Sequence, residues 1–78
     1  MGAPLVVGAE QALGELTPRK REVARLVSRG LTNAEIAEQL VLSEGTVANH
    51  VQEILQRLGL RSRTQLAVWI AAHARGSA

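Results

Sequence analysis

Apolar residues recur at helical spacing in four segments of the chain. In the clearest segment, between Ser43 and Gly59, they fall on one face of a helix turning by about 100° per residue. Small and amide side chains occupy the opposite face. The apolar positions are Val47, Val51, Ile54, Leu55 and Leu58, and the opposite ones are Gly45, Asn49, Gln52 and Gln56. The pattern predicts an amphipathic helix over residues 44–58, with Ser43 as its N-cap and Gly59 as its stop.

Two further helices are predicted before this segment. Thr17 and Pro18 have the N-cap and first-turn chemistry of a helix over residues 18–29, which Gly30 ends. Thr32 and Glu35 match a capping box that opens a short helix over residues 33–40. The expected buried stripes are Val23, Ala24, Leu26 and Val27 in the first helix, and Ile36, Ala37 and Leu40 in the second.

A fourth helix is predicted over residues 63–74, with a capping box at Ser62 and Gln65 and a stop at Gly76. It is apolar almost all round. Its inward stripe is expected to be Leu66, Trp69, Ile70 and His73, which leaves Ala67, Val68, Ala71 and Ala72 at the edge or outside. An extra apolar face on a small domain suggests a partner helix, and a two-fold homodimer is the simplest form.

The order of these elements favours an all-α helix-turn-helix domain. The second and third helices are joined by a connection of three to four residues, and the longer third helix has a polar outer face. Residues 15–76 are assigned to this domain. Residues 1–14 are Gly- and Ala-rich without a period, and are expected to be a disordered arm or the remnant of a linker.

Composition narrows the functional classes. The chain has 78 residues, no cysteine and one aromatic residue, Trp69, so the core must be aliphatic. No set of His, carboxylate or Ser residues has the spacing of a metal or catalytic site, and we expect no metal, no cofactor and no enzymatic activity. No apolar run is long enough to span a bilayer, so the default expectation is a cytoplasmic protein without membrane contact.

The net charge of +2 is unevenly distributed. Residues 17–29 and 57–75 are rich in arginine, whereas residues 30–56 contain four glutamates and no lysine or arginine. This order fits basic shoulders around a neutral or acidic face, and equally an ordinary charged surface. Arg19, Lys20 and Arg21 oppose the dipole of the first helix, which is compatible with a role facing phosphate.

Several motifs together resemble the LuxR-type helix-turn-helix domain. They lie at residues 16–23, 30–37, 42–47, 50–59 and at Arg63, in the order and spacing of that family. The resemblance implies a bacterial DNA-binding transcription regulator that forms a homodimer through its last helix. It also implies the output domain of a quorum-sensing protein or response regulator, with an N-terminal sensory or receiver domain in the full-length protein.

The resemblance assigns roles to individual residues. The base-reading positions are Ala48, Asn49 and Gln52, and the phosphate-contacting candidates are Thr46, Asn33, Arg57 and Arg63. The dimer-interface candidates are Ala67, Val68, Ala71 and Ala72. His50 matches a usual family histidine, for which packing or hydrogen bonding is favoured over DNA contact. The sequence departs from the family at Ala48, where lysine is common, and at Lys20, where glutamate is usual.

Two functions remain open from the sequence. The first is binding of operator DNA as a homodimer, with the helix over residues 44–58 in the major groove. The second is an interaction or dimerisation module that keeps the fold but binds DNA weakly or not at all. The intact motifs, the amide stripe and the basic flanks favour the first function. The absence of lysine and arginine from residues 30–56 favours the second.

Overall fold

The computed structural model describes the backbone of residues 14–74 and the side chains of residues 14–72. Four complete helices lie in this range: α2 (Pro18–Ser28), α3 (Asn33–Leu40), α4 (Glu44–Leu58) and α5 (Arg63–Ala74). Residues 14–74 contain no strand, so the prediction of an all-α domain with four helices is confirmed. The predicted arm, apart from Gly14, and the predicted stop at Gly76 lie outside the described residues.

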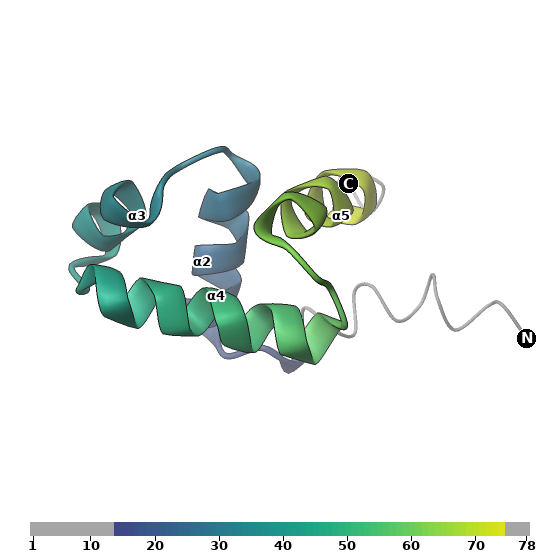
Figure 1. The fold of residues 1–78 in the computed structure, drawn as a ribbon, viewed down its shortest axis with the longest axis horizontal. Helices are drawn as coiled ribbons and strands as arrows, with labels where there is room; N and C mark the ends of the chain where they lie inside the picture. The colour runs from purple at the N-terminus through teal and green to yellow at the C-terminus, as the bar shows by residue number, and fades with distance from the viewer. Residues whose placement is uncertain (1–13, 75–78) are drawn as a thin grey trace, which may run out of the picture.

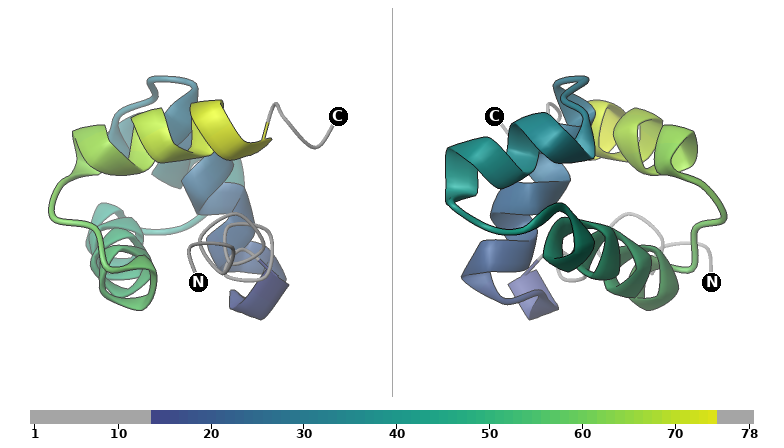
Figure 2. Two further views of the ribbon diagram at one scale, coloured as in Figure 1. Left: turned by 90° about the vertical axis from the view of Figure 1, so that its right-hand side faces the viewer. Right: turned by 60° about the vertical axis from the view of Figure 1, so that its left-hand side comes forward.

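The helices surround α2. Helix α4 runs along one side of the domain, with α3 near its N-terminal half, and the chain then turns back from its C-terminal end into α5 (Figure 1). Helix α2 packs against α3, α4 and α5, and so joins the helix-turn-helix pair to the last helix. Figure 2 shows α5 on the opposite side of the domain from α4, linked to it by one loop. None of the described helices combines the length and apolar character needed to cross a bilayer.

The core is aliphatic, as the composition predicted. Its buried residues are Leu16, Val23, Ala24, Leu26, Val27, Ile36, Ala37, Val47, Val51, Ile54, Leu55, Leu66 and Ile70. No polar or charged residue among those described is buried. Leu40, Leu58 and Trp69, which were expected to point inward, are partly buried at the margin of this cluster. The side chain of His73 lies outside the described part.

Three helix starts follow the predicted local chemistry, with Thr17, Thr32 and Ser43 as the N-caps of α2, α3 and α4. Thr17 caps α2 by accepting the Lys20 N–H at 3.2 Å. Thr32 accepts the Glu35 N–H at 3.1 Å, and the Glu35 carboxylate accepts the Thr32 N–H at 2.8 Å, which completes the capping box. These contacts satisfy amide groups that a helix leaves without an internal partner, so the start of each helix is set locally.

The start of α5 corrects one prediction. The Gln65 N–H does bond to Ser62 Oγ at 3.1 Å, but the side-chain oxygen of Gln65 accepts from the Arg61 N–H at 2.8 Å. The chain bends at Ser62, and the amide within reach of Gln65 is the one before the N-cap. The capping box predicted for this helix is therefore only half formed.

The turn between α3 and α4 has an unusual backbone conformation that the sequence analysis did not anticipate. Val41 lies in the left-handed region, with φ of 58° and ψ of 52°. This conformation lets the Leu42 N–H bond back to the Ala37 carbonyl at 2.9 Å and redirects the chain into α4. Left-handed backbone costs about 1–2 kcal/mol in an L-residue, and Val41 recovers little by burial because it is 88% exposed.

Replacing Val41 with glycine should therefore stabilise the domain. Glycine adopts left-handed backbone without a Cβ clash, and the lost valine side chain makes few contacts. We expect the free energy of unfolding to rise by about 1 kcal/mol in a urea titration followed by far-ultraviolet circular dichroism.

Val41→Ala is the matched control, because it removes the outer methyl groups but keeps the Cβ atom. It should give a smaller gain than glycine. A glycine variant less stable than the wild type would contradict the left-handed turn.

Candidate nucleic-acid interface

The outer face of α4 is open to solvent along its length. Ala48, Asn49 and Gln52 are all exposed, while Val47 and Ile54 on the opposite face are completely buried. The structure thus brings the three base-reading candidates together on one accessible side of a single helix. Because the core contacts use only the opposite side, the residues on this face are free to contact a ligand.

The N-terminus of α4 is held by a small hydroxyl network. Ser43 Oγ accepts the Thr46 N–H at 3.0 Å and lies 2.9 Å from Thr46 Oγ1, to which it donates. Thr46 is half-buried beside the exposed face. With its oxygen already accepting, the Thr46 hydroxyl hydrogen is available to donate outward.

Arg63 ties the first residue of α5 to the start of α3. Its guanidinium donates to Asn33 Oδ1 at 2.6 Å and to the Leu31 carbonyl at 2.5 Å. Because a guanidinium can only donate, the Asn33 atom facing it must be the oxygen, and the Asn33 NH₂ group points elsewhere. The structure therefore joins two of the phosphate-contacting candidates in one hydrogen-bonded unit.

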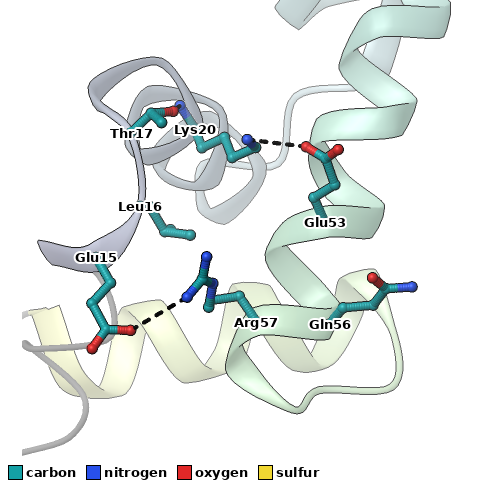
Figure 3. Close-up of a pocket in the computed structure, with 7 residues that line it drawn as sticks. All are labelled: Glu15, Leu16, Thr17, Lys20, Glu53, Gln56 and Arg57. Atoms are coloured by element: carbon teal, nitrogen blue, oxygen red, sulfur yellow. Dashed lines mark hydrogen bonds and ion pairs between the residues drawn. The ribbon is translucent and has the colours of Figure 1, made fainter.

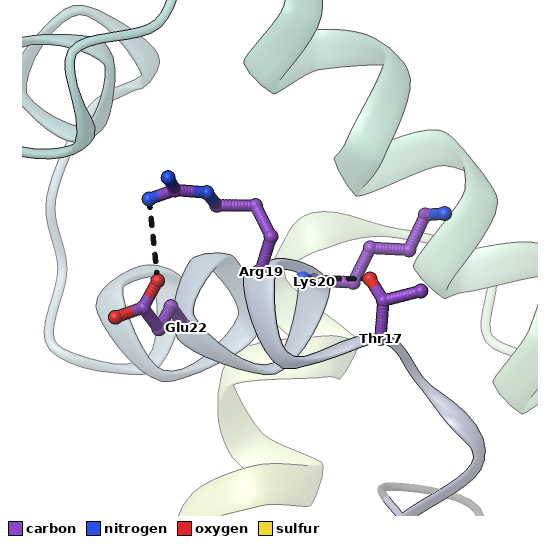
Figure 4. A network of polar contacts seen from close by, with 4 residues as sticks. All are labelled: Thr17, Arg19, Lys20 and Glu22. Atoms are coloured by element: carbon purple, nitrogen blue, oxygen red, sulfur yellow. Dashed lines mark hydrogen bonds and ion pairs between the residues drawn. The ribbon is translucent and has the colours of Figure 1, made fainter.

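The three cations in the first turn of α2 all have partners within the chain. Arg19 pairs with Glu22 at 3.3 Å on the same helix (Figure 4). Lys20 pairs with Glu53 of α4 at 3.0 Å. Arg21 donates to the Leu16 carbonyl at 2.8 Å. The sequence analysis considered these cations for phosphate and missed their internal partners.

Two of the ion pairs lie in one open pocket of about 580 Å³ between the N-terminal end of the domain and α4 (Figure 3). The pocket is lined by Glu15, Leu16, Thr17, Lys20, Glu53, Gln56 and Arg57. Arg57 of α4 pairs with Glu15 at 3.8 Å. The Lys20–Glu53 pair lies one turn nearer the N-terminus of α4. The pocket thus contains two cations and two carboxylates.

Glu53 has a perturbed ionisation equilibrium in this pocket. The hydrogen bond and the positive charge of Lys20 lower the pKa of the Glu53 carboxyl below its ordinary value of 4.5, with a smaller effect from His50. Since the folded pKa is the lower one, the favourable interaction is present above 4.5 and is lost as the pH falls through the lowered value. Glu53 is therefore ionised and paired at neutral pH.

His50 lies at the edge of the core on the same side of α4. Its Nδ1 atom is shielded from solvent, has no hydrogen bond to any residue between 14 and 72, and lies 3.9 Å from the Glu53 carboxylate. The contact is too long for a hydrogen bond. The partly buried position fits the packing part of the expected role, and the hydrogen bond named with it is not made by Nδ1 in the part of the chain that the structure describes.

The outer side of α5 carries the residues expected at a dimer interface. Val68, Ala71 and Ala72 are exposed, whereas Ala67 is half-buried against the core. Val68 and Ala72 line a shallow, mainly apolar groove of about 440 Å³, whose other residues are Leu60, Thr64, Gln65 and Trp69. The four candidates therefore divide into three on the open face and one at its margin.

Comparison with known proteins places this arrangement in a family. Residues 14–70 match the family described as "Bacterial regulatory proteins, luxR family". The chain is 41% identical over 61 residues to the nitrate/nitrite response regulator protein NarL of Escherichia coli K12, covering 78% of this chain and 28% of that protein. It is 43% identical over 60 residues to the DNA-binding transcriptional activator DevR/DosR of Mycobacterium tuberculosis H37Rv, covering 77% of this chain and 28% of that protein.

A third relative, the two-component response regulator PprB of Pseudomonas aeruginosa, is 49% identical over 55 residues, which are 70% of this chain and 20% of that protein. The chain thus spans only a quarter or so of the length of these relatives. The family match covers most of the chain and includes all of α2, α3 and α4. From this match and the four-helix fold, the chain belongs to the luxR family of bacterial regulatory proteins.

Proposed function

We propose that this domain binds double-stranded operator DNA as a homodimer, with α4 of each subunit in the major groove. The observation that carries the proposal is the exposed amide face of α4, which lies opposite a fully buried face and follows a capped N-terminus. A helix of this kind fits the width of the major groove of B-form DNA. Two-fold symmetry would place the half-sites about one helical turn apart.

The proposed base readers have complementary chemistry. Asn49 and Gln52 each offer a donor and an acceptor, which suits bidentate contact with the N6 and N7 edge of adenine. Ala48 offers a methyl group that can pack against the methyl group of thymine. The domain should therefore favour sites rich in A·T base pairs at the positions that α4 reaches.

The proposed phosphate contacts surround this face. Thr46 donates its free hydroxyl hydrogen, and Asn33 donates its NH₂ group while Arg63 holds its oxygen. Arg57 reaches phosphate by exchanging its contact with Glu15, which is long and exposed to solvent. Such contacts set the position of the protein on the duplex without reading its sequence.

The proposed dimer forms through the outer face of α5. Ala67, Val68, Ala71 and Ala72 give this face small and apolar side chains that let two helices approach closely. The longer relatives named as response regulators support a further part of the proposal. The full-length protein carries a sensory or receiver domain on the N-terminal side of this one, and regulates transcription in response to its signal.

A second candidate function is an interaction module that has lost DNA binding. It is favoured by the absence of lysine and arginine from residues 30–56, and by the internal pairing of the cations at the start of α2. The two functions differ in one measurable property. Binding that depends on phosphate contacts weakens steeply with salt, since each contact releases counterions. An anisotropy titration of mixed-sequence duplex DNA at 50 and 200 mM salt distinguishes them.

Removing both amides of the reading face should abolish sequence preference without unfolding the domain. Asn49→Ala with Gln52→Ala changes two exposed side chains, so the free energy of unfolding should shift by less than about 0.5 kcal/mol for each. Discrimination between a duplex enriched from a random library and a mixed-sequence duplex should fall by about 1–3 kcal/mol per lost bidentate contact. Gln39→Ala, on an exposed part of α3, is the control and should leave discrimination unchanged.

Introducing the lysine common in the family tests the alternative. Ala48→Lys adds a cation to a segment that has none, so it should strengthen binding to all duplexes. A wild-type domain without salt-dependent binding, together with an Ala48→Lys variant that has it, would establish the interaction module instead.

The two arginine candidates should respond differently to substitution by alanine. Arg57→Ala should lower the slope of log affinity against log salt by about one and leave stability nearly unchanged, since this side chain is mostly exposed. Arg63→Ala should weaken DNA binding and also lower the free energy of unfolding by about 2 kcal/mol, because two hydrogen bonds from a charged donor are lost. Equal stability of the two variants would mean that the Arg63 tie does not form in solution.

Placing charge on the outer face of α5 should weaken dimerisation. Val68→Glu or Ala71→Glu puts a carboxylate in a region that the dimer would desolvate, while the monomer leaves both positions exposed. Sedimentation equilibrium should show a larger dissociation constant for the dimer, and operator affinity should fall with it. Gln39→Glu, which adds the same charge on α3, should leave the dissociation constant of the dimer unchanged, and it corrects operator affinity for the added charge alone. Unfolding of the α5 variants would show instead that this face belongs to the core.

A further inference from the structure

Two cations and two carboxylates line the pocket beside α4, one of each from either side. Glu15 and Lys20 come from the N-terminal end of the domain, while Glu53 and Arg57 come from α4. Figure 3 shows the Glu53 and Arg57 side chains pointing toward the N-terminal residues, and Gln56 pointing away from them. Each cation therefore faces a carboxylate of the other element.

These charges lie close to the proposed DNA-reading face. Glu53 follows Gln52 directly and is four residues from Asn49, so its side chain neighbours the amide stripe on the helix surface. The spacing of such neighbours, about 5–6 Å, is well within the screening length of about 10 Å at 0.1 M salt. The charge of Glu53 is therefore felt by any phosphate bound along this flank of α4.

We propose that Glu53 and Glu15 limit the sequence-independent part of the DNA binding proposed above, by competing with DNA phosphates for Lys20 and Arg57. A free cation at this flank would strengthen binding to every duplex, whatever its sequence. A paired cation must exchange its carboxylate for phosphate, and the released carboxylate then repels the same phosphate. The pairs therefore suppress binding that depends only on charge, and leave the base contacts of Asn49 and Gln52 unaffected.

The polarity of the interhelical pair gives this effect its direction. Lys20 belongs to α2 and Glu53 to α4, so the acidic member of the pair lies on α4, beside the reading face. Exchanging the two residues would keep the ion pair but move the positive charge onto α4. The expected consequence of the arrangement in this chain is weak non-specific binding, with affinity that depends on base contacts and on the dimer.

Opposite responses to the loss of either partner test the proposal. Both pairs are accessible to solvent, and exposed ion pairs contribute little to stability, so each single variant should fold. Glu53→Gln frees Lys20 and should tighten binding of a mixed-sequence 20-bp duplex, whereas Lys20→Met leaves Glu53 unpaired and should weaken it. The double variant should return close to wild type. A purely structural role of the pair would weaken binding in both single variants.

Salt dependence provides the quantitative readout. One additional phosphate contact steepens the slope of log affinity against log salt by about 0.9, so the advantage of Glu53→Gln over wild type should be about 3.5-fold larger at 50 mM than at 200 mM salt. Glu15→Gln should act in the same direction, and should have no effect when Arg57 is already glutamine. Discrimination between the enriched and the mixed-sequence duplex should stay unchanged in both carboxylate variants, because an added phosphate contact strengthens binding to both duplexes alike.

Glu38→Gln is the charge-matched control. It removes one carboxylate from an exposed position on α3 that has no ion pair among the described residues, so it corrects for the change in net charge alone. Suppose that the wild type binds DNA in a salt-dependent way, but Glu53→Gln raises affinity for the mixed-sequence duplex no more than Glu38→Gln does. That result would overturn this proposal and leave the proposed function intact. If the wild type shows no salt-dependent DNA binding and neither variant gains affinity, both this proposal and the proposed function are overturned.

Discussion

Burial of five aliphatic side chains from four helices holds this domain together. Val23 of α2, Ile36 of α3, Val47 and Ile54 of α4, and Leu66 of α5 are the largest fully buried residues, and they belong to one cluster. Burying such a side chain contributes about 1.5–3 kcal/mol relative to leaving it exposed. The buried residues among those described form a single cluster, so the positions of these four helices depend on the same contacts.

Within α4, the residues that stabilise the fold and the residues that we propose to bind DNA lie on different faces of the helix. The core uses one face of the helix, and the opposite face, which carries Asn49 and Gln52, contributes no buried contact. The flank between these faces carries Glu53 and Arg57, whose interactions with the N-terminal end of the domain are electrostatic and partly solvated. Charges on this flank can therefore adjust affinity for a polyanion while the fold remains unchanged, since exposed pairs contribute little to stability.

Two features outside the core set the orientation of the helix-turn-helix pair. The left-handed backbone at Val41 fixes the angle at which α3 gives way to α4, at a local conformational cost. Arg63 joins α5 to the start of α3 through hydrogen bonds to Asn33 and the Leu31 carbonyl. The last helix, which we propose as the dimer contact, is thus connected directly to the element that we propose contacts phosphate.

The sequence by itself determined the four helices, three of their starts and the inner face of α4. Those features depend on caps and apolar periods formed by residues within a few positions of one another, so local chemistry suffices. Only the tertiary structure decided the partners of the charged residues. Arg63 and Asn33 are 30 positions apart in the sequence, and Lys20 of α2 forms an ion pair with Glu53 of α4. Formal charge and helical spacing carry no information about such contacts, because they depend on how the helices pack around the shared core.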